Sequence, residues 1–147
     1  MTIIVGSSAF IAGDRRISND AGDRQPPCNK IFRNKYMVVG VAGFYSAIAA
    51  MQHSMRKGAC KPEDLIRDMG SHSQALCLWQ GNLYDVSEGC VTRIRSPVYA
   101  IGTGAHAALG YLAGCGKIND ATVRKAIRFT FTLRSDCGDG IRVVRPK

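Results

Sequence analysis

The chain has 147 residues, of which 46% are hydrophobic and 21% charged, a composition typical of one globular domain with its own core. Its formal net charge is +9, from 20 basic and 11 acidic residues, and no apolar run is long enough to span a membrane. The basic residues are scattered and have no interleaved aromatic residues for base stacking, so a nucleic-acid-binding module is the least favoured class of function. We expect a single domain over residues 1–147.

The six cysteines occur without CxxC pairs or regular spacing, so neither a zinc site nor a disulfide framework is indicated. The N-terminal stretch lacks the basic start and the long apolar core of a secretion signal. We therefore expect reduced thiols and a cytoplasmic location. The three histidines are too dispersed in the sequence to suggest a metal site, and we expect no metal and no cofactor.

In the first half of the chain, β patterns precede a pair of helical patterns. Runs rich in β-branched residues predict strands at 2–5, 9–12, 30–32 and 36–41. The polar segment 18–27 predicts a loop. Apolar residues at helical spacing predict a helix over 44–56 that Gly58 closes. Pro62, followed by two acidic residues, predicts a second and shorter helix that Gly70 ends.

The second half repeats this order. Alternating patterns predict strands at 74–79, 83–86, 90–94, 98–101 and 141–144. A turn at Gly81-Asn82 joins the first two of them. Helices are predicted at 105–112 and 121–133, the latter capped by Asn119 or Asp120. Because strands come in runs and helices in pairs, we predict an α+β fold with two sheets between helical layers.

The first residues of the chain carry the most chemistry. Thr2 stands at the head of an apolar strand, and a second residue this small permits the removal of Met1. A terminal threonine then holds a hydroxyl nucleophile and a free amine in one residue, and the amine can accept the hydroxyl proton. Taken alone, Thr2 would simply begin a strand, and the motifs that follow make it a candidate nucleophile.

These motifs are Thr-x-x-Val-Gly at 2–6, Gly-Asp-Arg-Arg at 13–16, Asn-Lys-Ile-Phe at 29–32, Val-Gly-Val-Ala-Gly at 39–43, Gln-Gly-Asn-Leu-Tyr-Asp-Val at 80–86 and Tyr-Ala-Ile-Gly-Thr-Gly at 99–104. In this order, over essentially the whole chain, they resemble the proteasome β subunits and the bacterial HslV-type peptidase, which are N-terminal-nucleophile hydrolases. The resemblance implies a four-layer αββα sandwich with threonine peptidase activity.

The resemblance also implies roles for individual residues. Thr2 takes the place of the nucleophile, and its own amine acts as the base. Lys30 matches the family's catalytic lysine, whose positive charge would lower the pKa of that amine, and Asp14 would hold Lys30 in place. Gly40 would supply the N–H for the developing oxyanion. Without the resemblance, Asp14 and Lys30 would be interpreted as a surface ion pair.

The late part of the matched site departs from the family pattern. Thr103 stands where the family commonly has a serine, and Asp136 matches the family's late aspartate after a one-residue shortening; both would orient the amine. Gly138 and Asp139 occupy the place of a further serine. The same matching places four residues in the first specificity pocket, which would favour small or medium hydrophobic side chains: Ile17, Cys28, Val38 and Ala42.

Two functions of different classes follow as alternatives. The first is a threonine-type peptidase that acts on peptide or protein substrates as a self-compartmentalised homo-oligomeric ring. Any ATPase unfoldase would be a separate chain, because the sequence has no Gly-x-x-x-x-Gly-Lys-Ser/Thr motif. The second is a catalytically silent structural or assembly protein with the same fold. If Met1 persists, Thr2 has no free amine and the second function is favoured.

Overall fold

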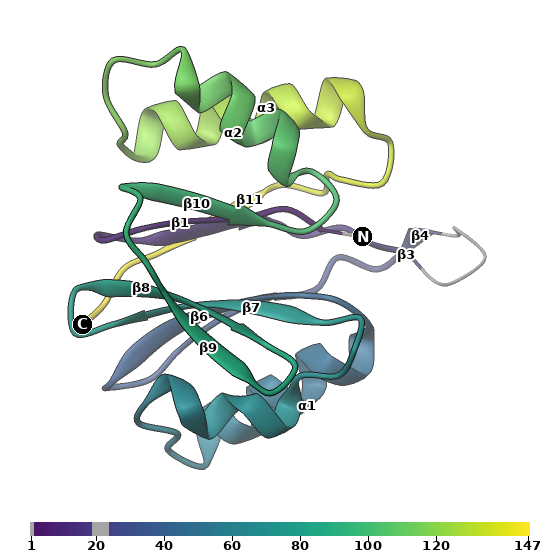
Figure 1. The fold of residues 1–147 in the computed structure, drawn as a ribbon. Helices are drawn as coiled ribbons and strands as arrows, with labels where there is room; N and C mark the ends of the chain where they lie inside the picture. The colour runs from purple at the N-terminus through teal and green to yellow at the C-terminus, as the bar shows by residue number, and fades with distance from the viewer. Residues whose placement is uncertain (1, 19–23) are drawn as a thin grey trace.

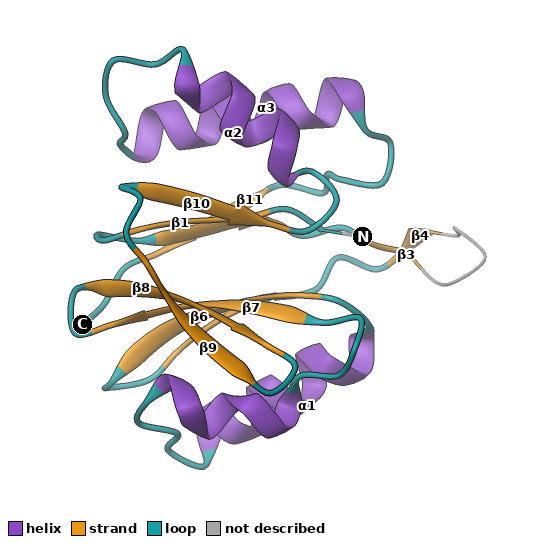
Figure 2. Ribbon diagram, in the orientation of Figure 1, coloured by secondary structure: helices purple, strands orange, loops and turns teal. Residues whose placement is uncertain are grey.

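The structure is a computed structural model that describes residues 2–18 and 24–147, so Met1 and residues 19–23 lie outside the described part. Two antiparallel sheets are stacked face to face, and a helical layer covers the outer face of each (Figure 1). Coloured by element type, the layers run helix, sheet, sheet, helix (Figure 2). This confirms the predicted α+β class and the four-layer αββα arrangement.

The upper sheet in Figure 1 has four strands in the order β10-β1-β2-β11. Their bounds are Val98–Ile101, Ile4–Ser7, Ile11–Asp14 and Ile141–Val144. Helices α2 (Ala105–Ala113) and α3 (Asp120–Leu133) cover this sheet. Apolar side chains such as Val5 and Ile127 fill the space between the sheet and the two helices.

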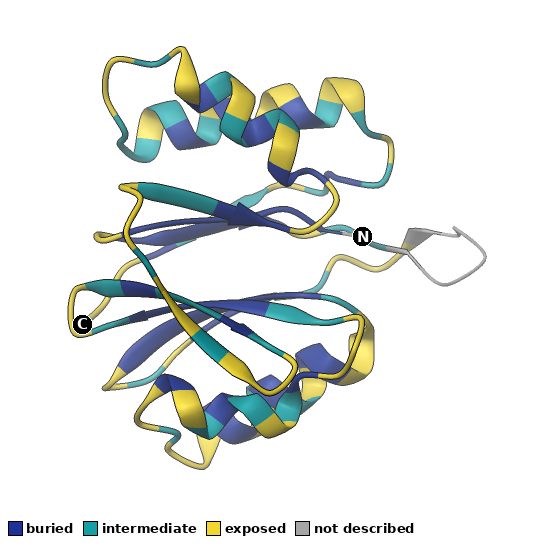
Figure 3. Cartoon of the chain, in the orientation of Figure 1, coloured by how far each residue is buried: buried dark blue, intermediate teal, exposed yellow. Residues whose placement is uncertain are grey.

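The lower sheet has five strands in the order β5-β6-β7-β8-β9. Their bounds are Ile31–Arg33, Met37–Ala42, Gln74–Trp79, Asn82–Ser87 and Cys90–Ile94. Helix α1 (Tyr45–Arg56) and the 3₁₀ helix η1 (Pro62–Asp68) lie on its outer face. A third apolar cluster, which includes Ile4, Ile11 and Leu76, fills the space between the two sheets. In Figure 3 the buried residues of both sheets are coloured dark blue.

Local differences from the predicted elements follow from backbone geometry. The hairpin between β7 and β8 turns at Gln80 and Gly81, with φ of 49° and 74°, one residue earlier than predicted. The predicted loop 18–27 contributes to a small ribbon of β3 (Ile17–Ser18) and β4 (Arg24–Gln25), and its residues 19–23 lie outside the described part. The second predicted helix forms as η1, and extended backbone at Met69 ends it before Gly70.

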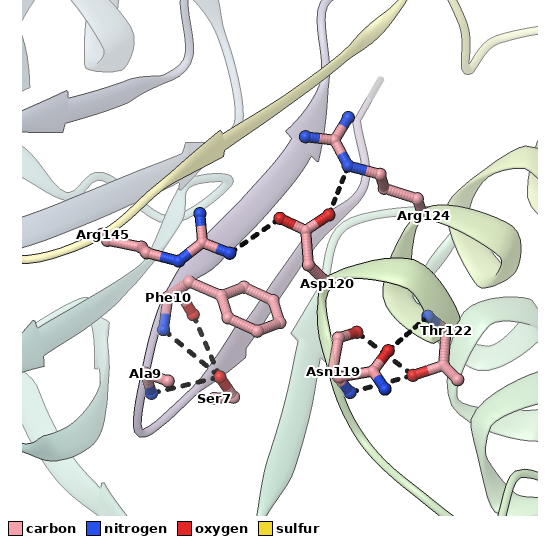
Figure 4. A network of polar contacts seen from close by, with 8 residues as sticks. All are labelled: Ser7, Ala9, Phe10, Asn119, Asp120, Thr122, Arg124 and Arg145. Atoms are coloured by element: carbon pink, nitrogen blue, oxygen red, sulfur yellow. Dashed lines mark hydrogen bonds and ion pairs between the residues drawn. The ribbon is translucent and has the colours of Figure 1, made fainter.

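Polar contacts at the start of α3 fix the C-terminal strand (Figure 4). The Asn119 side chain accepts a hydrogen bond from the Thr122 N–H over 2.9 Å, which confirms one of the two predicted caps. Asp120, the first helical residue, pairs instead with Arg124 and with Arg145, the latter over 2.8 Å. Because Arg145 follows β11, this contact ties the end of the upper sheet to α3. Within the described ranges, no helix is both long and apolar enough to cross a membrane.

Candidate active site

A cavity of about 1550 Å³ opens where β1 begins and where β6 and β10 end. Thr2 lines this cavity and is 3% exposed. Of the ten residues that the sequence suggests for the site, the structure brings six to its wall: Thr2, Ile17, Cys28, Ala42, Thr103 and Asp136. They come from segments spread over the whole chain, so the fold assembles this part of the predicted site.

Asp14 and Lys30 form a fully buried ion pair beside the residue that follows Thr2. The Lys30 ammonium donates to Asp14 Oδ1 over 3.0 Å, and neither side chain is exposed. The same carboxylate accepts the backbone N–H of Ile3 at 3.0 Å and that of Gly138 at 3.1 Å. Burial raises the pKa of Asp14, and the charge of Lys30 opposes that rise. The alternative interpretation of these residues as a surface pair is therefore wrong.

Gly40 and Val38 lie in the apolar core and do not line the cavity. Both belong to β6, and Val38 is fully buried among the side chains that separate the two sheets. A Cβ atom on Gly40 would lie 2.6 Å from Ile4 Cγ2 and 2.9 Å from Ile11 Cγ2. Glycine is required at this position because the two sheets pack closely there. Val38 therefore does not contribute to the cavity wall, where the matching placed it, while the role of the Gly40 N–H toward an oxyanion stays a prediction.

The end of the same strand does reach the cavity. Ala42 and Gly43 line it, as do Phe44 and Tyr45 at the start of α1. No side chain caps this end of α1 within the part of the chain that the structure describes. The N-terminal end of α1 therefore adjoins the cavity, and the helix dipole gives this end a partial positive charge. Such a partial positive charge favours a developing oxyanion, and it lies three to five residues beyond Gly40.

Gly102, which belongs to the Gly-Thr-Gly segment at 102–104, lies against the backbone of Thr2. Its φ is +89°, and a Cβ atom there would overlap the carbonyl oxygen of Thr2. Two residues on, the Gly104 N–H donates to that carbonyl over 3.4 Å. The Gly-Thr-Gly segment thus holds the backbone of Thr2 against the end of β10. Two glycines flanking a polar residue at a strand end are the signal that could have indicated this close approach.

Thr103 and Asp136 meet at the cavity wall. The Thr103 hydroxyl donates to Asp136 Oδ2 over 3.2 Å. Arg134 pairs with both oxygens of Asp136, at 3.0 and 3.1 Å, and these hydrogen bonds hold the pKa of that carboxyl below its usual value. The interaction is complete at neutral pH and weakens as the pH falls through the lowered pKa of Asp136.

The loop that departs from the family pattern docks on the segment after β2. The carbonyl of Gly138 accepts the N–H groups of Arg15 and Arg16 at 3.0 Å each. The Arg16 guanidinium donates to the Ser135 carbonyl and to Asp139 Oδ2, the latter over 3.4 Å. Together with the Gly138 N–H on Asp14, these contacts attach the loop to the buried ion pair through backbone groups, at the place where the family pattern has a serine.

The cavity has a second, polar wall. Four hydroxyl or amide side chains line it on the side of the lower sheet: Ser71, Ser73, Gln74 and Ser87. Behind them, the Gln74 amide donates to Asp85 Oδ2 over 2.6 Å. The other oxygen, Asp85 Oδ1, is buried and has no hydrogen-bond partner among the described residues. Burial raises the pKa of Asp85, and the Gln74 hydrogen bond opposes that rise.

We expect Asp85→Asn to raise the Tm at about pH 7 and to leave it unchanged at about pH 3, because the folded state holds the Asp85 proton more tightly than the unfolded chain. The stability from this group is complete below the unfolded value of 3.8 and is lost as the pH rises through the raised pKa. Thermal unfolding at both pH values checks this. Glu88→Gln, which removes an exposed charge in the next turn, is the control. A lower Tm for Asp85→Asn at neutral pH contradicts the prediction.

The fold of this chain is similar to that of solved peptidase structures. No protein-family model and no curated protein sequence matches the chain. Eukaryotic HslV from Trypanosoma brucei superposes with a TM-score of 0.71 at 18% identity, over 97% of this chain and 97% of that chain. The chain has the fold of the HslV-type peptidases. The Thiobacillus denitrificans BPH in complex with epoxomicin superposes with a TM-score of 0.73 at 15% identity, over 99% of this chain and 98% of that one.

Because these identities are low, the likeness to HslV is one of fold. The position of Thr2 at the start of the first strand, beside a cavity and a buried ion pair, is a property of this chain's own residues.

Proposed function

We propose that this chain is a threonine-type peptidase that cleaves peptide bonds with Thr2 as its N-terminal nucleophile, after removal of Met1. The proposal rests on the contacts of the buried Asp14 carboxylate. One buried carboxylate binds the backbone of Ile3, the ammonium of Lys30 and the late loop, while Thr2 lines the adjoining cavity. A fully buried charge pair is costly to maintain, and perturbed ionisable groups of this kind cluster at functional sites.

In the proposed mechanism, Thr2 Oγ attacks the carbonyl carbon of the scissile peptide. The α-amine of Thr2 takes the hydroxyl proton and passes it to the leaving amine. A free α-amine titrates at about 7.7–8.0, and the positive charge of Lys30 would lower that pKa, which increases the neutral fraction at cellular pH. The N–H groups at Gly43 and the start of α1 would stabilise the oxyanion. Water then hydrolyses the ester that forms on Thr2.

The cavity walls suggest the substrate class. Ile17, Cys28 and Ala42 line the cavity together with Thr2, and all three side chains are apolar and of small or medium size. We expect peptides with small or medium hydrophobic residues on the acyl side of the cleaved bond. Burial raises the pKa of the Cys28 thiol, which keeps it protonated and in the role of an apolar wall at neutral pH.

The test compares wild type with Thr2→Ala and Thr2→Ser on a small hydrophobic peptide amide, after intact mass has shown that Met1 is absent. We expect Thr2→Ala to abolish hydrolysis and Thr2→Ser, which keeps both hydroxyl and amine, to retain measurable turnover. Unchanged unfolding curves would show that the fold is intact. Epoxomicin, which BPH binds, should add its mass to the N-terminal peptide of wild type and not of Thr2→Ala. Hydrolysis by Thr2→Ala near the wild-type rate would refute the assignment.

A specific observation favours the second candidate, a catalytically silent structural or assembly protein. Asp136, which would orient the Thr2 amine, is held on both oxygens by Arg134 and is therefore already engaged. The absence of wild-type hydrolysis after confirmed loss of Met1 would support this candidate. Restoration of activity by Arg134→Gln would instead show that Arg134 inhibits a competent site.

A peptidase in the cell also requires restricted access, and we propose that the chain assembles as a closed homo-oligomeric ring, with any ATPase unfoldase as a separate chain. Large apolar side chains available for such contacts are exposed on α3 and at the start of α1: Phe129, Leu133, Phe44 and Tyr45. Light scattering at working concentration should give an integral multiple of 15.9 kDa. A mass of one chain would contradict the prediction.

A further inference from the structure

A second cleft, of about 720 Å³, lies where the edges of the two sheets meet. Strand β5 is the outer strand of the lower sheet, and β11 is the outer strand of the upper sheet within the described ranges. Residues from both strands and from the end of α1 line the cleft. No residue is shared with the lining of the Thr2 cavity.

The lining of this cleft is strongly basic. It includes four arginines and, among the described residues, no carboxylate: the arginines are Arg33, Arg56, Arg142 and Arg145. Arg145 is already paired, because its guanidinium bonds Asp120 and lies 5.7 Å from the Phe10 ring centre (Figure 4). The other three are exposed too, and none of them forms an ion pair with a described acidic residue. Arg33 donates one hydrogen bond, to the Arg145 carbonyl over 3.2 Å. We call this second cleft, with Arg33, Arg56 and Arg142 in its lining, the arginine cleft.

Three like charges around one cleft repel one another, and an anion placed among them would relieve that repulsion. Guanidinium groups bind carboxylates through two parallel hydrogen bonds. The amide side chain of Gln52 lines the same cleft and adds a further neutral donor. A ligand that fits this cleft is therefore anionic. The other residues of the lining distinguish an acidic peptide from a nucleic acid.

Two observations favour a peptide over a nucleic acid. The aromatic side chain in the lining is Phe32, which is 8% exposed and so offers no face on which a base could stack. The strands β5 and β11 are sheet edges, where an added peptide strand can pair. A nucleic acid backbone offers acceptors but lacks the alternating donors and acceptors of such a strand.

We propose that the arginine cleft binds an extended acidic peptide segment, whose carboxylates pair with Arg33, Arg56 and Arg142 while its backbone lies along β5 or β11. This site is separate from the Thr2 cavity and does not depend on the peptidase proposal. Its occupant is an acidic segment of a partner protein, for which the charge of the three arginines is complementary.

The test measures fluorescence anisotropy with a labelled peptide of alternating glutamate and valine, and with its glutamine counterpart. We expect wild type to bind the glutamate peptide with a salt-dependent Kd and to bind the glutamine peptide much more weakly. Arg56→Gln/Arg142→Gln should weaken binding by roughly tenfold or more, because it removes two charge-assisted contacts. The control, Arg95→Gln/Arg128→Gln, changes net charge equally on exposed arginines outside the cleft and should bind almost as wild type does.

Each alternative result overturns the proposal. Equal weakening by both double variants would mean that net charge alone attracts the peptide. Tighter binding of an oligothymidylate of matched charge would identify a nucleic-acid site, and no binding by wild type would leave the cleft without an anionic peptide ligand.

Arg142→Gln alone should melt at the same temperature as wild type or higher, since it relieves repulsion. A clear loss of Tm would show that Arg142 supports the fold and is not free for a ligand.

Discussion

Replacing Lys30 by methionine is expected to destabilise the fold by about 3–5 kcal/mol, because it leaves the Asp14 carboxylate buried without its partner charge. Lys30 and Asp14 are each 1% exposed, and their 3.0 Å contact has no solvent to screen it. Methionine matches the length and apolar stem of lysine, so the change removes the charge and leaves the core filled. Urea unfolding measures the loss in the free energy of unfolding, as a lower midpoint at an unchanged m-value.

The matched variant is Lys30→Met/Asp14→Asn, which removes both charges. The new amide keeps an acceptor for the Ile3 N–H and loses one of the two acceptor oxygens, so one of the Ile3 and Gly138 contacts is weakened. We therefore expect the double variant to recover much, but not all, of the stability that Lys30→Met loses. A double variant less stable than Lys30→Met would contradict the view that an uncompensated charge causes the loss.

The double variant also separates structure from catalysis. A folded double variant without hydrolysis supports a catalytic role for the Lys30 charge. Because the Thr2 amine would regain its ordinary pKa, any residual activity should rise at higher pH than in wild type. Lys30→Arg should fail as well, since its bulkier planar group does not fit the buried position of an ammonium. Wild-type rates with an unchanged pH profile in the double variant would show that Lys30 holds the fold and nothing more.

The buried pair also shows what the sequence could and could not reveal. The layered fold was predictable, because the period of each apolar pattern and the pairing of helices recur in the described elements. Burial of Asp14 and Lys30 was not predictable from local pattern, since a lone charged residue beside an apolar run is normally solvated. Only the resemblance linked these two residues. Their burial depends on Ile3 and Gly138, which lie far apart in the chain and meet in three dimensions.

The sequence motifs do not show what each of their glycines does in the fold. Gly40 and Gly43 flank the end of one strand, and a motif match cannot tell which of them faces the cavity. The alternation of the strand places Gly40 toward Ile4 and Ile11, so it serves the contact between the sheets. Gly43, with φ of +151°, leads into α1 beside the cavity. Sheet-to-sheet packing decides this assignment, and it is a property of the whole fold.

Gly102→Ala is expected to be the most damaging glycine substitution near the site. Its φ of +89° is strained for an L-residue, which costs about 1–2 kcal/mol by itself. The added Cβ would also overlap the Thr2 carbonyl oxygen, which is backbone and cannot rotate away. We therefore expect a loss of at least about 3 kcal/mol in the free energy of unfolding and a displaced Thr2. Under the peptidase proposal, hydrolysis should fall even at temperatures where the variant remains folded.

Two other glycines serve as matched controls for the same substitution. Gly89 has φ of +67° and open space around its Cβ position, so Gly89→Ala should show the backbone strain alone. Gly110 lies inside α2 with no atom near its Cβ position, so Gly110→Ala should stabilise the chain by about 0.5–1 kcal/mol. The loss in the free energy of unfolding caused by Gly102→Ala, minus the loss caused by Gly89→Ala, then measures the contact with Thr2. A difference near zero would mean that the Thr2 carbonyl can move freely, and the Gly-Thr-Gly segment would no longer account for its position.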